Sequence, residues 1–350
     1  MHPIKRCVKT TLEGVDCDKP SFYICFMKNV SILIPETAVI EAVADPHYMF
    51  KAVNQFLMAS GKAPLFHVQF VGMKKEIKLE NSLYTVHIEK LLKEVKKTDL
   101  IVIPAISGDI KTALKLNKDV IPWIVEQYQR GAEVASLCIG AFLLAATGLL
   151  DGKKCSSHWN AANEFRLMFP AVEFVDGSII TEENGIYSSG GANSYWSLLL
   201  YLVEKYTDRD TAILASKFFA VDIDRDSQAS FMMFKGQKEH NDPEILKAQG
   251  FIEESYQEKI TVEELADKFS IGRRSFERRF KKATNNTVVE YMQRVKIEAA
   301  KRSFETSLKN INEVMLEVGY TDTKAFRTIF KKITGLTPIE YRNKYHKPVV

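Results

Sequence analysis

A cysteine stands where a buried strand is expected to turn into a helix. Residues 133–137 form an apolar run typical of a strand, and Cys138 follows directly, ahead of a helix expected to reach Thr147. A side chain at such a turn is expected to be exposed, and the helix N-terminus beyond it favours a thiolate or a bound anion. His158 is a candidate base or hydrogen-bond partner for this thiol. The pair indicates nucleophilic chemistry or ligand binding, although a lone cysteine or histidine is more often a packing residue.

Positive charge is the second source of chemistry, and it gathers on two helices near the C-terminus. Residues 311–318 and 323–333 carry apolar stripes at helical spacing, and the second of these helices has lysine and arginine on its other face. Residues 261–269 and 273–282 repeat this arrangement about 50 residues earlier, with residues 288–299 as a linking helix. A helix fits the major groove of DNA, where arginine and lysine reach phosphates and base edges. One such face is about as often merely solvated, but its repetition favours DNA binding.

The ends of these helices carry residues that suit helix termini. Polar side chains accept hydrogen bonds from the first backbone N–H groups, and glycine adopts the left-handed backbone that ends a helix. The expected start and stop residues are Thr261 with Glu264, Asn310 with Glu313, Asp322, Thr337 with Pro338, Gly319 and Gly335.

The last of these helices carry a specific signature. Residues 319–342 read GYTDTKAFRTIFKKITGLTPIEYR, and residues 260–345 as a whole resemble the DNA-binding domain of AraC/XylS-type transcription regulators. The resemblance implies double-stranded DNA as the partner. Two places depart from the usual pattern. Gly272 and Arg273 stand where a serine cap and often a proline open the first recognition helix, and Asn285 stands where glycine is usual. Asparagine tolerates left-handed backbone, so that turn is expected to survive.

Carried over position by position, the resemblance predicts which side chains meet DNA. Base contacts are expected from Arg274, Glu277, Arg278, Thr323, Lys324, Arg327 and Thr328. Phosphate contacts or solvated charges are expected at Arg279, Lys281, Lys331 and Lys332. The two recognition helices should enter successive major-groove turns on one face of DNA, about 34 Å apart.

The cysteine region carries a second resemblance. Residues 134–152 read VASLCIGAFLLAATGLLDG, and with Ser157-His158-Trp159 and residues 187–193 they resemble the nucleophile elbow and a later loop of PfpI-like domains. These domains are flavodoxin-like and belong to the class I glutamine amidotransferase superfamily. In regulators that carry such a domain in front, the resemblance implies a ligand-sensing pocket, with catalysis usually absent.

The pocket is expected to involve residues at strand ends around the cysteine. The predicted ligand-binding residues are Glu36, Ser107, Cys138, Ile139, His158 and Gly190. No clear third member of a catalytic triad follows His158, and the usual glycine-rich turn reads Ala105-Ile106-Ser107-Gly108 here. Cys138 and His158 are therefore interpreted as vestiges of a catalytic site, with no catalytic residue, metal or cofactor expected.

Length and charge predict two domains of different character. The 350 residues carry a net charge of +4. From Glu244 onward there are 21 lysines and arginines against 15 acidic residues, a net +6, which leaves −2 for the residues before it. An acidic front half with a basic tail suits a sensor joined to a nucleic-acid binder. The predicted boundaries are a poorly ordered extension at 1–28, a PfpI-like domain at 29–235, a linker at 236–243 and a DNA-binding domain at 244–346.

The front half alternates strands and helices, which predicts a mostly parallel sheet with helices on both faces, a flavodoxin-like α/β fold. The C-terminal domain is predicted to be all-α. Strands are expected at residues 30–34, 66–71, 83–86, 100–103 and 133–137, and helices at 48–58, 88–95, 118–130, 195–206 and 212–218.

These patterns predict a cytoplasmic transcription regulator that senses a small molecule near Cys138 and forms a homodimer. Five cysteines without metal-type spacing indicate a reducing compartment, and no run of about 18 apolar residues predicts a membrane span. The alternative is a cysteine-dependent amidase or peptidase with a nucleic-acid-targeting tail. A redox switch at Cys138 is a third possibility, which needs a lowered thiol pKa.

Overall fold

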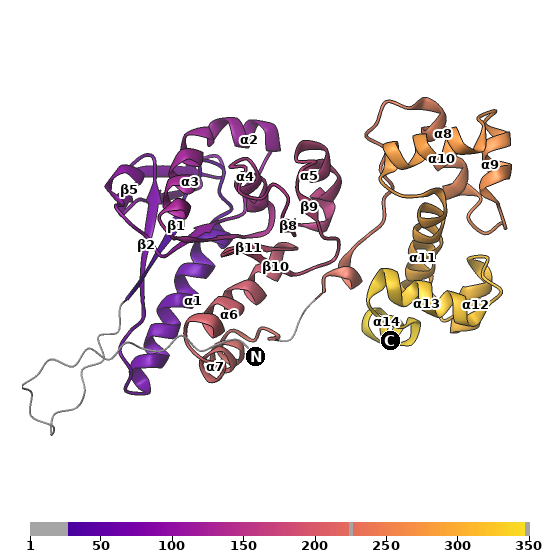
Figure 1. Ribbon diagram of the computed structural model, residues 1–350. Helices are drawn as coiled ribbons and strands as arrows, with labels where there is room; N and C mark the ends of the chain where they lie inside the picture. Colours follow the sequence, from indigo (N-terminus) through magenta and orange to yellow (C-terminus); the bar gives the residue numbers. More distant parts are fainter. Residues whose placement is uncertain (1–26, 224–226, 347–350) are drawn as a thin grey trace, which may run out of the picture.

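The computed structural model describes residues 27–223 and 227–346, shown as coloured ribbon in Figure 1. The predicted extension at 1–28 lies almost wholly outside the described residues. None of the described helices is long and apolar enough to span a lipid bilayer.

A seven-stranded sheet forms the centre of the front half, in the order β10-β11-β7-β6-β1-β2-β5. All neighbouring pairs are parallel except β10 with β11. The central order β2-β1-β6-β7-β11 is the flavodoxin-like one, which confirms the predicted fold class. The strands are β1 (Lys28–Leu33), β2 (Phe66–Gly72), β5 (Lys90–Leu91), β6 (Leu100–Ile103), β7 (Glu133–Ser136), β10 (Ile180–Glu183) and β11 (Ile186–Ser189).

Two short strand pairs lie outside this sheet. β3 (Glu76–Leu79) and β4 (Tyr84–His87) form an antiparallel hairpin, and β8 (Lys154–Cys155) pairs in parallel with β9 (Glu173–Phe174).

Helices cover both faces of the sheet, because alternate residues of each strand point to opposite sides. In β6, Leu100 and Val102 join a core formed with α1, α6 and α7, whereas Ile101 and Ile103 join a core formed with α2 to α5 (Figure 1). The helices are α1 (Ile40–Ala59), α2 (Ile110–Leu116), α3 (Ile121–Gln129), α4 (Ala141–Ala145), α5 (Ala162–Met168), α6 (Tyr195–Tyr206) and α7 (Arg209–Phe219). Short 3-10 turns are η1 (Leu92–Glu94), η2 (Lys118–Val120), η3 (Cys138–Gly140), η4 (Trp159–Ala161), η5 (Ala192–Ser194) and η6 (Ala229–Phe231).

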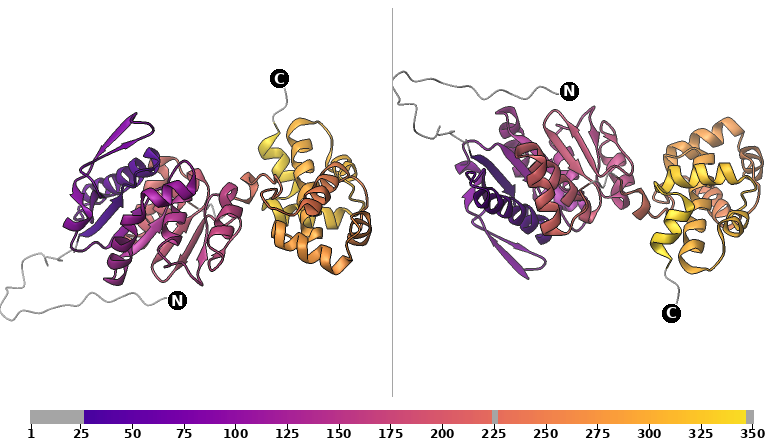
Figure 2. Two further views of the ribbon diagram at one scale, coloured as in Figure 1. Left: turned by 90° about the horizontal axis from the view of Figure 1, so that it is seen from above. Right: turned by 90° about the horizontal axis from the view of Figure 1, so that it is seen from below.

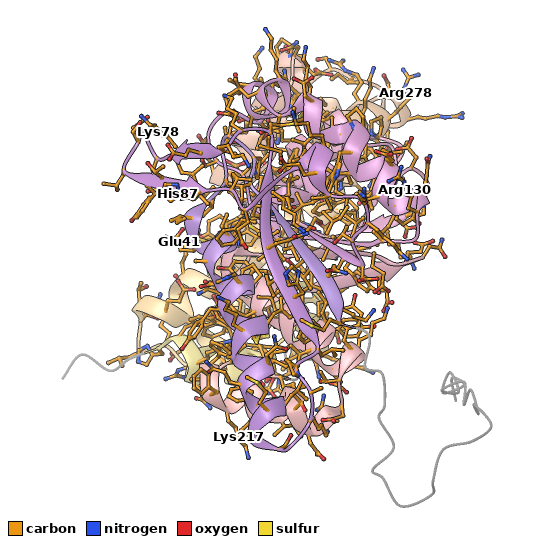
Figure 3. The ribbon with its side chains drawn as sticks, turned by 90° about the vertical axis from the view of Figure 1, so that its left-hand side faces the viewer. Glu41, Lys78, His87, Arg130, Lys217 and Arg278 are labelled. Atoms are coloured by element: carbon orange, nitrogen blue, oxygen red, sulfur yellow. The ribbon has the colours of Figure 1, made fainter. Side chains whose placement is uncertain are left out.

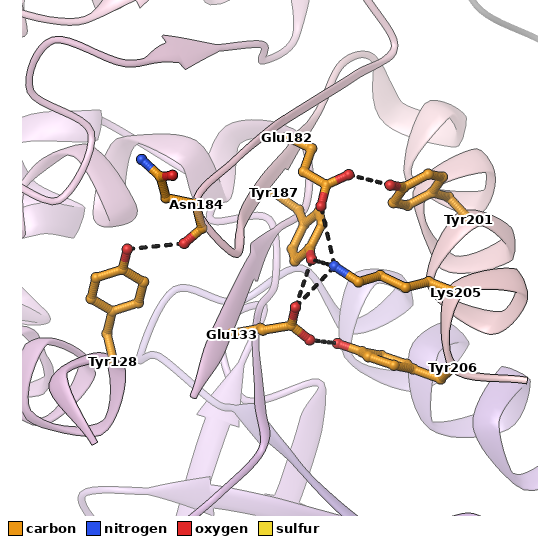
Figure 4. A network of polar contacts seen from close by, with 8 residues as sticks. All are labelled: Tyr128, Glu133, Glu182, Asn184, Tyr187, Tyr201, Lys205 and Tyr206. Atoms are coloured by element: carbon orange, nitrogen blue, oxygen red, sulfur yellow. Dashed lines mark hydrogen bonds and ion pairs between the residues drawn. The ribbon is translucent and has the colours of Figure 1, made fainter. Parts of the chain in front are cut away.

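A polar network joins α6 to strands β7, β10 and β11 of the sheet (Figure 4). Lys205 lies 2.9 Å from Glu133 and 3.1 Å from Glu182, and Tyr187 donates to Glu133 over 2.8 Å. Tyr201 and Tyr206 donate to the same two carboxylates. Since each carboxylate has both a cation and a hydroxyl as partners, we interpret this network as a structural one.

Two predictions for the front half are wrong. The helix predicted at 88–95 is edge strand β5 followed by η1, because pairing with β2 overrides an apolar spacing that also fits a helix. The first helix begins at Ile40 and runs through Pro46, rather than starting after it. The predictions also lacked α2 and β3, which are only seven and four residues long and so give little periodic signal.

Within residues 227–346, seven α-helices form the C-terminal half around two small cores. Helix α11 (Val288–Thr306) belongs to both, with Tyr291 in the first core and Phe304 in the second. The other helices are α8 (Pro243–Glu254), α9 (Val262–Lys268), α10 (Arg273–Thr284), α12 (Ile311–Glu317), α13 (Thr323–Thr334) and α14 (Pro338–Tyr345). The all-α arrangement is as predicted, and Figure 2 shows it beside the sheet with a narrow connection between them.

The predicted helix termini of this half are confirmed. Thr261, Asn310 and Thr337 each form a capping box with the glutamate three residues on. Asp322 caps α13 by accepting from Ala325 N–H at 2.9 Å. Gly335 ends α13 with a φ of 75°.

The segment predicted as a linker, residues 236–243, packs with the C-terminal helices. The Gln237 carbonyl accepts from Gln249, His240 bonds Gln249 at 2.8 Å, and Asp242 caps α8. These contacts assign the segment to the C-terminal half.

Candidate functional site

The first recognition helix, α10, has an apolar and a cationic face. Phe276 and Phe280 are fully buried in the first core. Arg274, Glu277 and Arg278 lie on the exposed side. Helical periodicity therefore gathers three of the predicted base-contacting side chains on one outward surface.

The arginines at this surface differ in whether their guanidinium groups are already bonded to other side chains. Within the described ranges, Arg274 and Arg278 form no hydrogen bond or ion pair, and Figure 3 shows Arg278 extending away from the ribbon. Arg273 instead bonds Glu263 at 3.0 Å and lies 3.7 Å from Glu277. The two unoccupied guanidinium groups have all their donors available for an incoming acceptor.

Arg279, predicted as a phosphate contact or a solvated charge, is engaged by a carboxylate within the protein. Its guanidinium is half-buried and forms two hydrogen bonds with Asp242, Nε to Oδ2 at 2.9 Å and Nη2 to Oδ1 at 2.6 Å. These bonds hold the pKa of Asp242 below its usual value. Asp242 also caps α8, so Arg279 fixes α8 against α10.

The second recognition helix, α13, repeats the design. Phe326 and Phe330 are fully buried in the second core. The other face carries the predicted contacts, with Thr323 half-buried and the remainder exposed. The exposed members are Lys324, Arg327, Thr328, Lys331 and Lys332.

The turns before and after these helices require left-handed backbone. Gly319 precedes α13 with a φ of 75°, and a Cβ there would lie 2.2 Å from the Gln257 carbonyl oxygen. The first unit places Ser270 in the corresponding turn with a φ of 52°. Asn285 ends α10 with a φ of 56°, which confirms the predicted tolerance for asparagine.

Cys138 occupies the predicted turn between strand and helix, with a strained φ of 54°. The prediction that its side chain is exposed is wrong, because it is 4% exposed and packs within the core on the α1 and α6 side. Burial raises the pKa of the thiol to about 11, against the opposing effect of a hydrogen bond from Ile139 N–H. The group is therefore a neutral thiol near pH 7, which opposes the predicted thiolate and redox switch.

The hydrogen bonds of His158 in the described residues do not include the Cys138 thiol. Its Nδ1 accepts from Asn160 N–H at 3.1 Å, its ring packs on Trp159, and burial lowers its pKa. No hydrogen bond joins it to Cys138 within residues 27–223 and 227–346. The neighbouring Ser157 hydroxyl instead donates to the Cys138 carbonyl at 2.9 Å.

The other predicted pocket residues lie beyond the carboxyl ends of the strands, where ligands bind in such folds. Glu36 follows β1 and pairs with Lys74 at 2.6 Å. Ser107 follows β6 and donates its N–H to Thr37 O at 2.8 Å, so these two loops are adjacent. Ile139, half-buried, packs against both cores.

Glycines allow close backbone approach at this edge. A Cβ on Gly140 would lie 2.4 Å from the Pro104 carbonyl oxygen, so glycine lets the start of α4 contact the end of β6. A Cβ on Gly190, which follows β11, would lie 2.2 Å from Gln228 Nε2.

Gln228 was not predicted from the sequence. It lies in an irregular segment without periodicity or motif, yet it is 2% exposed and its side chain bonds three loops of the front half. A cleft of about 740 Å³ lies between α5, residues 235–239 and the end of α10, and Cys138 is not among the residues that line it.

Comparison with known proteins divides the chain in the same way. Residues 45–205 match the DJ-1/PfpI family, and residues 265–344 match a family described as a helix-turn-helix domain. Two relatives from Pseudomonas aeruginosa are the HTH-type transcriptional regulators GbdR, 24% identical over 68% of this chain, and ArgR, 26% identical over 61%. The chain spans 65% of the length of each of these curated relatives.

A solved structure gives a further likeness to the fold. A Vibrio parahaemolyticus protein assigned as a transcriptional regulator matches with a TM-score of 0.50 and 20% identity. The match covers 55% of this chain and 98% of that one.

Proposed function

We propose that this chain, which belongs to the AraC-type regulators that carry a DJ-1/PfpI domain ahead of their helix-turn-helix domain, binds DNA sequence-specifically and regulates transcription. The observation that carries the proposal is the repeated geometry of α10 and α13. Each helix presents arginine, lysine or threonine opposite a pair of buried phenylalanines. Since α11 contributes to both cores, a single chain presents two recognition helices in a fixed relation.

The exposed arginines are the candidates for reading sequence. A guanidinium can donate two hydrogen bonds to the major-groove edge of guanine, a contact that discriminates by about 1–3 kcal/mol. Arg274 and Arg278 in α10, and Arg327 in α13, are exposed at the matching positions. Lys331, on the last turn of α13, is assigned to phosphate, which adds affinity without sequence information.

The front domain is proposed to bind a small-molecule effector without converting it. The loops that carry Glu36, Ser107, Cys138 and Gly190 all follow strands of the parallel sheet, which supports a ligand site at this edge. A neutral thiol without a histidine partner does not support the alternative of a cysteine-dependent amidase or peptidase. The named relatives are transcriptional regulators, which supports the same conclusion.

The regulator is proposed to act as a cytoplasmic homodimer. Tyr48 of α1 and Phe218 of α7 are 54% and 53% exposed and lie against each other, an apolar surface that suits self-association. Sedimentation of the purified chain at micromolar concentration checks this, and a monomer at all concentrations would exclude it.

Selection from random DNA tests the proposed function. The full chain is incubated with a pool of random duplexes, and bound DNA is sequenced over successive rounds. We expect a two-part motif, bound about 10³-fold or more tightly than scrambled DNA of the same length. Arg278→Ala should lose about 1–3 kcal/mol on this motif and much less on scrambled DNA. Equal affinity of the wild-type chain for every duplex would overturn sequence-specific binding.

A further inference from the structure

A short segment, residues 227–234, contacts both halves of the molecule, and we call it the strap. It contains η6 and lies between the sheet and α14 in Figure 1. Its attachment to the front half has a backbone part, in which Gln228 N–H donates to the Gly177 carbonyl at 2.8 Å and Ser227 forms a bridge with Ser178, and a part made by one buried side chain. Gln228 donates from Nε2 to the carbonyl oxygens of Ser157 at 3.1 Å and Ser178 at 3.0 Å, and its Oε1 accepts from Gly191 N–H at 2.9 Å. Both amide protons and the carbonyl oxygen are thereby satisfied.

The loops held by Gln228 are the loops that hold Cys138. Ser157, whose carbonyl binds Gln228, donates its hydroxyl to the Cys138 carbonyl at 2.9 Å. Ser189, two residues before Gly191, accepts from Cys138 N–H at 3.2 Å. A displacement of Cys138 at the end of β7 can therefore reach Gln228 by two routes. One route is Ser157 alone, and the other is the loop from Ser189 to Gly191.

The other end of the strap is bonded to the C-terminal half. Lys301 of α11 donates to the Met232 carbonyl at 2.5 Å, and Phe234 N–H donates to Glu298 at 3.1 Å. Lys301 and Glu298 also pair with each other at 2.8 Å, with side chains only 5% and 13% exposed. Because a buried ion pair needs further hydrogen bonds to offset its desolvation, the strap backbone stabilises this pair.

The strap also touches the second recognition unit. Tyr345 of α14 donates to the Ser230 carbonyl at 3.1 Å, and Lys344 lies 4.5 Å from the ring of Phe231. A Cβ on Gly335, at the end of α13, would lie 3.7 Å from Ala229 Cβ. The exposed faces of α10 and α13 remain uncovered, so the strap sets the position of these helices without covering them.

Resting on the proposed function, we propose that the strap transmits a change at the Cys138 loops to the DNA-binding half, with Gln228 as the positioning residue that attaches it. An effector that displaces the loops of Ser157 and Gly191 removes two of the three side-chain partners of Gln228 and weakens the attachment of the strap. The strap then leaves α11, where Glu298 and Lys301 become hydrated, and the recognition helices lose their fixed relation to the front half. Attachment of the strap to the front half favours its attachment to α11, and the converse also holds, because the coupling between two sites is reciprocal.

Hydrogen exchange of the full chain, followed by mass spectrometry, tests this link with Gln228→Ala. We expect backbone amides of residues 230–236 and of α14 to exchange about tenfold or more faster than in the wild type, since the variant loses three hydrogen bonds. Gln127→Ala is the matched control. Gln127 is also buried and also bonds backbone groups, Thr98 N–H and the Val95 carbonyl, but it lies in α3, away from the strap. This control should leave exchange in α14 unchanged.

Acceleration confined to the loops around Ser157 and Gly191, with α14 unaffected, would overturn the link. If Gln228→Ala fails to fold, Lys301→Met tests the link from the other end, because methionine fills the buried site without the charge. Reciprocity then predicts faster exchange at Gly177, Gly190 and Gly191 in the front half. Exchange that changes only in the C-terminal half would contradict the proposal. Binding of the wild-type chain to its selected DNA is measured in parallel. If the chain does not bind DNA, the proposed function is wrong. If it binds DNA but the exchange rates of the two halves are not coupled, only the proposed role of the strap is wrong.

Discussion

Phe276 and Phe280 in α10 pack as Phe326 and Phe330 do in α13, with ring centroids 5.7 Å apart and planes at 54° in both units. Each pair also meets a tyrosine of the following helices, Tyr291 or Tyr341. The two helix-turn-helix units therefore share one packing solution. What differs between them is the chemistry at the helix ends and on the outer face.

The helix ends are more firmly fixed in the second unit. Asp322 accepts a hydrogen bond at the start of α13, whereas Gly272 at the start of α10 has no side chain to do so. The left-handed turn is made by Gly319 in the second unit and by Ser270, at a cost in strain, in the first. The first unit compensates with contacts between helices, since Arg279 of α10 bonds the cap of α8. The two units can therefore pack their cores in the same way although their helix ends differ, because another contact holds α10 in place.

Removing a core ring from either unit should give the largest effect. Phe280→Ala and Phe330→Ala should each lower the free energy of unfolding of the C-terminal half by about 3–5 kcal/mol, because each ring is fully buried. Urea unfolding followed by far-UV circular dichroism measures the change.

Tryptophan fluorescence provides the internal control for this experiment. All three tryptophans, Trp123, Trp159 and Trp196, lie in the front half, so their transition should not move. If one of the two variants lowers the free energy of unfolding several times more than the other, the two cores are not equivalent.

The caps should give a smaller and unequal effect. Asp322→Ala should cost about 1 kcal/mol of stability, because it leaves the first N–H groups of α13 without a side-chain acceptor. Gly272→Ser, which adds a cap to α10, should stabilise by a few tenths of a kcal/mol. Thermal unfolding by circular dichroism compares the two variants, and a destabilised Gly272→Ser would show that the start of α10 is fixed by another constraint.

The smallest effect is expected from single charges. Lys331→Ala should lower the slope of log affinity against log salt concentration by about one, the contribution of one phosphate contact. Arg279→Ala is the comparison, because its guanidinium is engaged by Asp242 and should change the slope less. Anisotropy titrations of labelled DNA at several salt concentrations measure both slopes. A reduction by Arg279→Ala as large as that by Lys331→Ala would show that Arg279 contacts phosphate.

Local chemistry was predictable from the sequence, and contacts across the chain were not. The capping boxes at Thr261 and Asn310 depend on residues three apart, and the structure confirms both. The exposure predicted for Cys138 failed because the core that covers it is built from distant elements, including Tyr195 of α6. Gln228 carries no local signal, since its partners lie between 37 and 71 residues away in sequence.

Changing the spacing of the selected DNA motif tests most directly whether both recognition helices bind one face of the duplex. The account predicts that inserting about 5 base pairs between the two halves of the motif, half a helical turn, reduces the affinity of the full chain to that for a single half. Inserting about 10 base pairs should not restore it, because α11 fixes both helices in one chain. Affinity that is unchanged by the half-turn insertion would contradict binding by two linked helices.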